Sequence, residues 1–186
     1  MVKIESLKDY LNILDEEELE SLSTKIYMII DLICKDYPKY KEWFFTKQLP
    51  ETINTNKRNI LFVKNDKNEI ISMACLKKYE TEQKICTLYV SDSCRGLGIG
   101  SAIIEESMKW LETTKPFITI ADYKLEMFRP IIKKYNWKLT EIVSGFYNNK
   151  SQELCFNGIL TNNKTIKTQL YKKLVYAINC RIKDYK

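Results

Sequence analysis

Residues 95–101 read Arg95-Gly96-Leu97-Gly98-Ile99-Gly100-Ser101 and contain three of the chain's five glycines. An apolar run at 85–90 precedes them, and apolar residues at helical spacing follow at 103, 104, 108 and 111. A strand that leads through a glycine-rich turn into a helix points several backbone N–H groups and the positive helix end at one place. Because glycine lacks a Cβ, an anion can come close to this backbone. The stretch therefore predicts an anion-binding turn, and a tight turn with no ligand is the alternative.

The glycine spacing separates this turn from two known phosphate-binding loops. The dinucleotide fingerprint has the form G-x-G-x-x-G and needs an acidic residue about 20 residues further on. Gly100 comes one residue too early for that pattern. A Walker A loop needs a lysine before its serine or threonine, and residues 95–101 hold no lysine. Neither loop fits this chain.

Written as Arg95-x-x-Gly98-x-Gly100, the turn resembles the pyrophosphate loop of the GCN5-related N-acetyltransferases (GNAT family), whose signature is (Gln/Arg)-x-x-Gly-x-(Gly/Ala). The resemblance implies acetyl-CoA as co-substrate, with its pyrophosphate held by loop amides. It also implies that backbone groups of Leu88, Tyr89 and Val90 run beside the pantetheine arm. Arg95 either pairs with a phosphate or is a solvated charge. The amides that the resemblance assigns to the pyrophosphate are those of Gly96, Leu97, Gly98, Ile99, Gly100 and Ser101.

The predicted elements follow one another in the order known from the same family. A helix capped by Asp15, with Glu18 at capping-box spacing, extends to about residue 37. A second helix from residue 38 is expected to end before Pro50, and residues 51–58 read as a polar loop. A first strand near residue 4 is weak or missing. Further on we expect strands at 59–64, 70–76 and 84–90, a helix at 98–112, a strand at 117–120, a helix at 124–135 and a hairpin of 137–146 with 152–158.

This order resembles the acyl-CoA N-acyltransferase (GNAT) fold, an α/β fold with a mixed central sheet flanked by helices. The resemblance spans residues 1–160. In that family the strand before the glycine loop and the strand after its helix splay apart, and the pantetheine arm lies in the gap. Residues 161–186 are an appended segment in which lysines alternate with an apolar stripe, and this pattern predicts a basic amphipathic helix. Its apolar positions are Ile166, Leu170, Leu174, Ile178 and Ile182.

Composition limits the range of functions. At 186 residues, 45% of them apolar, the chain is long enough for one well-buried domain. The whole net charge of +6 falls in residues 161–186, so residues 1–160 are neutral and do not form a general nucleic-acid-binding surface. No apolar run reaches the roughly 18 residues that cross a bilayer, and the first residues lack the core of a signal peptide. We therefore expect a cytoplasmic protein whose six cysteines are reduced.

Catalysis must proceed without histidine, because the chain has none. This excludes Ser-His-Asp and Cys-His chemistry and the common histidine-based metal sites, so no metal is expected. Acetyl transfer needs a deprotonated amine and a proton donor for the departing thiolate. In the family this donor is often a tyrosine, and Ile132 stands at its place here. Tyr135 and Tyr123 are the nearby substitutes, with packing roles as the alternative.

No acidic residue lies within the predicted strand 84–90, where the family often has its base. Glu80 and Glu82 precede the strand and are candidates. Asp122 follows the next strand, and it is a candidate base or the N-cap of the following helix. An amine of low pKa, or water alone, would need no base. The aromatic residues that wall the acceptor pocket in the family, or simply pack in the core, correspond to Trp43, Phe44 and Phe45, followed by Lys47.

The sequence thus predicts an acetyl-CoA-dependent N-acetyltransferase that acts on a primary amine. The amine belongs to a small molecule or to a protein; an aminoacyl-tRNA would use the basic tail. The tail's alternative role is to pack on its own chain or to form a homodimer, and membrane contact is not expected. Two other functions stay open: a non-catalytic acyl-CoA-binding module, and an interaction protein whose partner binds residues 161–186.

Overall fold

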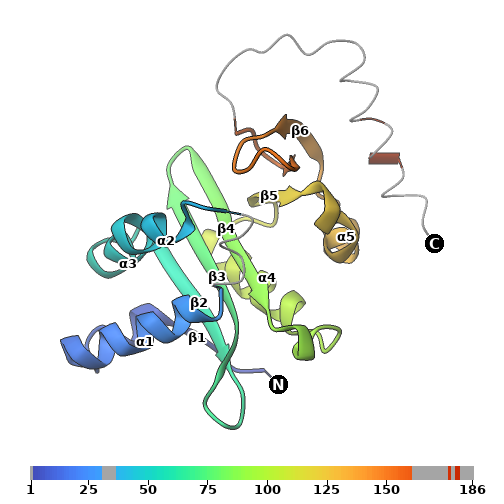
Figure 1. Ribbon diagram of the computed structural model, residues 1–186. Coiled ribbons are helices and arrows are strands. Elements are labelled where there is room, and N and C mark those ends of the chain that lie inside the picture. Colours follow the sequence, from blue (N-terminus) through green and yellow to red (C-terminus); the bar gives the residue numbers. More distant parts are fainter. Residues whose placement is uncertain (1, 31–36, 161–175, 177–178, 181–186) are drawn as a thin grey trace. The chain divides into compact units, whose positions relative to one another are not determined.

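The computed structural model describes residues 2–30, 37–160, 176, 179 and 180. The chain forms two compact units, Met1–Thr113 and Thr114–Lys186 (Figure 1). Each unit combines helices with an antiparallel sheet, and the predicted α/β class is confirmed.

The first unit is built on a four-stranded antiparallel sheet in the order β1-β2-β3-β4 (Figure 1). The three predicted strands are confirmed, and the weak first strand is present as β1. β3 and β4 are longer than predicted, because residues at their ends continue the strand pairing, with Tyr79 opposite Glu82. Lys77 also forms an ion pair with Glu82 across the hairpin. Glu82 therefore lies within a strand and not in the connection before it. The strands are β1 (Ile4–Ser6), β2 (Arg58–Lys64), β3 (Ile70–Tyr79) and β4 (Glu82–Val90).

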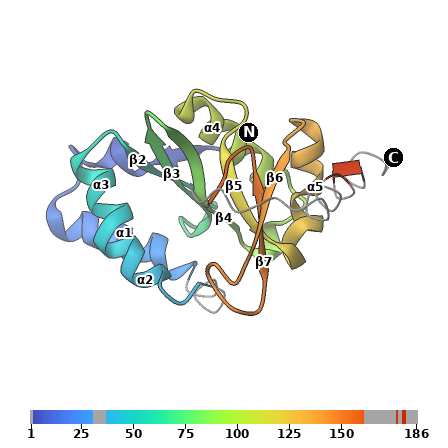
Figure 2. The same cartoon turned by 90° about the horizontal axis from the view of Figure 1, so that it is seen from above.

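Both faces of this sheet are covered by helices. Alternate residues of β2 and β3 point to one face, where Phe62 and Cys75 join a buried cluster with Ile26 of α1 (Glu16–Met28). On the other face lies α4 (Ile99–Leu111), which contacts β3 and β4 (Figure 2). The capping box predicted at the start of α1 is confirmed: Asp15 accepts a hydrogen bond from the Glu18 amide at 2.8 Å, and the Glu18 carboxylate accepts one from the Asp15 amide at 3.2 Å.

The helical segment after residue 38 differs from the prediction. It consists of α2 (Tyr40–Trp43), the π-helical turn η3 (Phe44–Gln48) and α3 (Leu49–Asn54). The predicted end before Pro50 and the predicted loop over 51–58 are therefore wrong. Pro50 is tolerated because it stands in the first turn of α3, where its missing N–H is not needed. As a result Gln48, Glu51 and Thr52 lie on one continuous helical segment.

The second unit has a three-stranded antiparallel sheet in the order β5-β7-β6, formed by β5 (Phe117–Ala121), β7 (Gln152–Phe156) and β6 (Leu139–Ser144). A 3-10 turn, η5 (Asp122–Lys124), and α5 (Leu125–Lys134) connect β5 to β6. Trp137, which precedes β6, is buried and donates its indole N–H to the Thr114 carbonyl at 2.9 Å. The predicted strand, helix and closing hairpin are thus confirmed, with a shorter β6.

The predicted basic helix at 161–186 lies outside the described residues, apart from 176, 179 and 180, which are helical. Asn179 contacts β6, the outer strand of the second unit's sheet. Its side-chain oxygen accepts from the Leu139 amide at 3.2 Å, and its amide nitrogen donates to the Leu139 carbonyl at 3.3 Å. Among the described residues no helix has the length and apolar character to span a bilayer.

Candidate functional site

The glycine turn adopts the open conformation that its composition predicts. After β4 a 3-10 turn, η4 (Asp92–Cys94), leads into residues 95–98. Gly96 and Gly98 have φ angles of +79° and +80°, and a side chain would be strained there. Gly98 is the N-cap of α4 and supplies no side chain to cap that helix end. A Cβ built on Gly96 or Gly98 would meet no atom within 4 Å, so the backbone faces open space.

The amides of this turn are available to a ligand. The first intrahelical hydrogen bond of α4 runs from the Ala102 amide to the Gly98 carbonyl at 3.0 Å. Within the described part of the chain, no hydrogen bond found uses the amide N–H groups of residues 96–101. Unpaired amides at a helix N-terminus attract anions. The pyrophosphate of acetyl-CoA, with its several acceptor oxygens, fits this donor set.

Arg95 is held at the surface beside the turn. Its Nη2 lies 2.6 Å from Asp92 Oδ1, and the two side chains are 43% and 81% exposed. An ion pair this exposed contributes little to stability. The Arg95 guanidinium is therefore accessible both to a ligand phosphate and to solvent, and the two interpretations of Arg95, a phosphate partner or a solvated charge, both stay open.

Leu88, Tyr89 and Val90 form the last part of β4 and are half-buried. They pair with β3, and Ser72 donates its hydroxyl to the Tyr89 carbonyl at 2.8 Å. The pairing shifts by one residue further back, because Cys75 lies opposite Thr87 and Leu76 opposite Ile85, which makes Cys86 a β-bulge. The bulge at Cys86 lies two residues before Leu88, the first of the three residues that the family resemblance assigns to pantetheine.

The structure brings no predicted acid or base to the glycine turn within the first unit. Glu82 begins β4 while the turn follows its end, which separates them by roughly 26 Å along the strand. Glu80 is exposed in the turn between β3 and β4, before Glu82, and the remaining candidates are in the second unit. There Ile132 is fully buried, and Tyr135, at the C-cap of α5, stacks on Trp137 with ring centroids 6.2 Å apart.

Asp122 and Tyr123 occupy η5, also in the second unit. Asp122 Oδ1 accepts from the Tyr123 amide at 3.0 Å, and Tyr123 is 58% exposed. The N-cap of α5 is Lys124, so the alternative role of Asp122 as that cap is wrong. The η5 turn intervenes between the strand and the helix, and the sequence carries no sign of it.

The aromatic segment of α2 and η3 is partly buried in the core and partly exposed. Phe44 is fully buried in the core cluster, which confirms the packing interpretation for this residue. Trp43 is half-buried, and the Arg58 guanidinium carbon lies 5.7 Å from its ring centroid. Lys47 is exposed.

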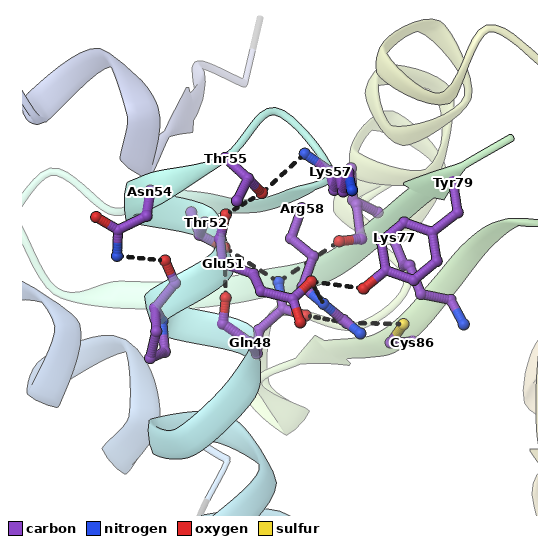
Figure 3. A network of polar contacts seen from close by, with 12 residues as sticks. Gln48, Glu51, Thr52, Asn54, Thr55, Lys57, Arg58, Lys77, Tyr79 and Cys86 are labelled. Carbon is purple, nitrogen blue, oxygen red and sulfur yellow. Dashed lines mark hydrogen bonds and ion pairs between the residues drawn. The ribbon is translucent and has the colours of Figure 1, made fainter.

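A polar cluster around Arg58 was not predicted. Arg58 is 3% exposed, donates Nε to Glu51 Oε2 at 3.0 Å and donates Nη1 to Gln48 Oε1 at 2.8 Å (Figure 3). The Tyr79 hydroxyl also donates to Glu51 Oε2, at 2.5 Å. Nη1 lies 3.9 Å from Cys86 Sγ at the bulge. Five separate elements (η3, α3, β2, β3 and β4) supply these five residues, so no spacing in the sequence marks them as neighbours.

The Arg58 cluster keeps Glu51 ionised. Burial by itself raises the pKa of Glu51, but the hydrogen bonds from Tyr79 and Arg58 and the Arg58 charge outweigh it and leave the pKa below its ordinary value of 4.5. The hydrogen bond to Glu51 and burial together raise the pKa of Tyr79. Glu51 is therefore suited to holding Arg58 in place rather than to accepting a proton near neutral pH.

We expect the contribution of Glu51 to stability to depend on pH. Its pKa is lower in the folded state, so its stabilising effect is complete above the unfolded pKa and is lost as pH falls through the folded pKa. Glu51→Gln should lower stability by about 1–2 kcal/mol at pH 7. Urea unfolding of both proteins at pH 7 and at pH 3 tests this. A difference that does not shrink at pH 3 would contradict the assignment.

Comparisons with known proteins identify the family and the fold of this chain. The model of the Acetyltransferase (GNAT) family matches residues 26–121, more than half of the chain, and the match includes the glycine turn. A protein from Desulfovibrio desulfuricans assigned to the GNAT family superposes with a TM-score of 0.51 at 11% identity, over 84% of this chain and 97% of that one. This likeness supports the fold.

Two further solved structures have lower scores. Nourseothricin acetyltransferase gives a TM-score of 0.49 at 10% identity, over 54% of this chain and 64% of that one. A protein from Bacillus anthracis assigned as a streptothricin acetyltransferase, solved with acetyl coenzyme A, gives 0.49 at 18% identity, over 57% and 65%. The matched part thus spans less than two thirds of either protein. A comparison with curated proteins found no match. On the family-model match and the fold, the chain belongs to the acetyltransferase (GNAT) family.

Proposed function

We propose that this protein transfers the acetyl group of acetyl-CoA to a primary amine. The observation that carries the proposal is the glycine turn, whose unpaired amides and open space lie at the N-terminus of α4. Family membership supports acetyl transfer in general. The choice of a primary amine as acceptor goes beyond what family membership supports and is part of the proposal.

The turn and the end of β4 are the proposed binding site for acetyl-CoA. The amides of residues 96–101 would neutralise the pyrophosphate, assisted by the α4 dipole. Backbone groups of Leu88, Tyr89 and Val90 would bind the amides of the pantetheine arm much as a neighbouring strand does. When bound, acetyl-CoA supplies the thioester that is attacked.

Proton transfer is the step with the fewest candidate residues. Among the described residues no three cysteine or acidic side chains gather as a metal site would require. Tyr135, Asp122 and Glu82 stay the candidate acid and bases. Because the chain has no histidine, none of its side chains has an ordinary pKa near neutrality. A side-chain acid or base would therefore need a shifted pKa to act at neutral pH.

We therefore expect the pH dependence of the reaction to follow the acceptor. The value of kcat/KM should rise with pH to an inflection at the pKa of the acceptor amine, because the amine must lose its proton before attack. Two acceptors whose pKa values differ by about two units should give inflections about two units apart. The measurement is the pH profile of CoA release with each acceptor. One shared inflection for both would indicate an enzyme base instead.

Calorimetric titration with acetyl-CoA, followed by an amine screen with thiol detection, tests the proposed function. We expect micromolar binding and CoA release that depends on the amine. No binding of acetyl-CoA would overturn the proposal.

A non-catalytic acyl-CoA-binding module is the second candidate. The observation that favours it is the buried Ile132, which stands where the family's tyrosine donor would be. It predicts the same binding but no amine-dependent CoA release, so the screen separates the two functions.

A further inference from the structure

Charge is divided unevenly between the two units. Residues 1–113 hold 16 lysines and arginines against 19 aspartates and glutamates, whereas residues 114–186 hold 14 against five. The neutrality of residues 1–160 therefore conceals a negative first unit, and the second unit carries a net charge of +9. Such an asymmetry within one chain is typical of proteins that bind a polyanion.

The carboxylates of the second unit do little to offset this charge where its sheet begins. Glu141 and Glu153 are only 8% and 1% exposed, and Glu141 accepts a hydrogen bond from the Leu160 amide at 2.7 Å. Asp122 and Glu126 are exposed, but both belong to the segment that follows the carboxyl end of β5. At the other end of the sheet, the described residues of this unit present lysines and no exposed carboxylate.

Four lysines lie at that other end, which we call the basic end. β5 and β6 both pair antiparallel with β7, so they run parallel and begin at the same edge of the sheet (Figure 1). α5 returns the chain from the end of β5 to the start of β6, so its last turn lies at this edge too. The four are Lys115, which precedes β5, Lys133 and Lys134 in the last turn of α5, and Lys138, which precedes β6.

Hydrogen bonds hold the segments of the basic end together. The Asn157 side chain donates to the Pro116 carbonyl at 3.1 Å and accepts from the Lys138 amide at 3.0 Å. The Trp137 indole donates to the Thr114 carbonyl at 2.9 Å. The chain before β5 is thereby fixed to the chain before β6, so the lysines of the basic end occupy one built surface.

One described residue of the basic segment 161–186 contacts the chain next to this surface. The Asn179 side chain forms its two hydrogen bonds with the backbone of Leu139, which directly follows Lys138. Tyr176, three residues earlier and also helical, is 72% exposed. An exposed ring beside lysines is the combination with which proteins bind single-stranded nucleic acids, because every base has a face that can stack on the ring.

The exposed apolar side chains favour a nucleic acid over a lipid surface. Membrane contact needs several apolar side chains next to the basic ones. Met127 and Phe146 lie at the opposite end of the sheet, in the first turn of α5 and after β6. Of the exposed aliphatic side chains in the described part of this unit, only Ile159 follows β7 at the basic end. One isoleucine does not anchor a protein in a bilayer.

We propose that the basic end and Tyr176 bind a single-stranded stretch of RNA. The lysines neutralise phosphates and so release bound counterions, while Tyr176 stacks on a base. Asn136 is exposed and accepts from Lys138 Nζ at 2.6 Å, and its amide suits a ribose 2′-hydroxyl. This surface belongs to the second unit and the glycine turn to the first, so the RNA site does not rest on the proposed function.

Fluorescence anisotropy of a labelled oligouridine of about twelve nucleotides tests the proposal on the full chain. Titrations at several salt concentrations give the dissociation constant and its dependence on salt. We expect micromolar affinity at low salt. Changing all four lysines of the basic end to glutamine should make the log–log slope shallower by about three, since each phosphate contact on a single strand contributes about 0.7. The affinity at low salt should fall at least about tenfold.

Four exposed lysines of the first unit give the matched control, because their change to glutamine removes the same charge from the other unit. We expect this control variant to keep the slope of the unmodified protein. Circular dichroism checks that both variants fold. The control positions are Lys25, Lys39, Lys41 and Lys67.

Tyr176→Ala should weaken binding about tenfold, and Tyr176→Phe should retain it, because phenylalanine still stacks. The matched oligodeoxyuridine should bind about fivefold more weakly, since it lacks the 2′-hydroxyl. Equal affinity for the two strands would overturn the choice of RNA.

No binding of oligouridine, or an equal loss of slope in the two lysine variants, would overturn the proposal. Binding to phosphatidylserine vesicles without binding to oligouridine would overturn it in favour of a membrane surface. RNA binding by a protein that does not bind acetyl-CoA would count against the proposed function and not against the RNA site.

Discussion

Replacing Gly98 with glutamate is expected to weaken acetyl-CoA binding at least about a hundredfold, equivalent to about 2.7 kcal/mol. Two effects combine. The φ angle of +80° strains any side chain, and the new carboxylate would enter the open space that faces the turn's unpaired amides. A negative charge at this place repels the pyrophosphate and competes for its donors. Calorimetric titration of both proteins at one ionic strength gives the two dissociation constants.

Gly98→Ala is the matched control for Gly98→Glu, since it places a side chain at the same positive φ angle without adding a charge. Its strain costs about 1–2 kcal/mol, and binding should fall by about tenfold. Circular dichroism of each variant checks that α4 still forms. Wild-type affinity in Gly98→Glu would mean that acetyl-CoA does not use this turn.

Phe44→Ala is expected to lower the free energy of unfolding of the first unit by about 3–5 kcal/mol. Phe44 has no exposed surface, and its ring lies 5.2 Å from that of Phe45 and 5.6 Å from that of Tyr27, measured between centroids. Truncation removes the apolar burial and leaves a cavity between helix and sheet. Urea unfolding followed by tryptophan fluorescence measures the change.

Ile13→Ala is the control for Phe44→Ala, because Ile13 is 73% exposed and should lose less than about 0.5 kcal/mol. A loss of less than about 1 kcal/mol at Phe44 would contradict its place in the core and would favour a pocket-lining role.

Local features of this fold could be predicted from the sequence. The glycine turn is such a feature, because glycine tolerates the positive φ angles that Gly96 and Gly98 adopt. The capping box at Asp15 and the hairpin strands follow from short-range rules as well. The prediction that the second helix ends before Pro50 was wrong, because a proline can either end a helix or stand in the first turn of the next one.

The Arg58 cluster could not be predicted in the same way. Arg58 is buried at the start of β2, whereas the sequence pattern placed it in a polar loop over residues 51–58. Its partners Gln48 and Cys86 come from a π-helical turn and a β-bulge, and both irregularities shift the register that pattern rules assume. Long-range pairing, rather than local propensity, creates this site.

The hydrogen bonds between Asn179 and Leu139 affect how the protein should be handled. A chain shortened to residue 160 would retain the glycine turn and the Arg58 cluster, and it would be an obvious choice for crystallisation. It would also uncover the amide and carbonyl of Leu139 on the outer strand, and uncovered strand edges pair with one another between molecules. Shortened preparations should therefore self-associate with time and concentration, whereas the full chain brings its own edge protection.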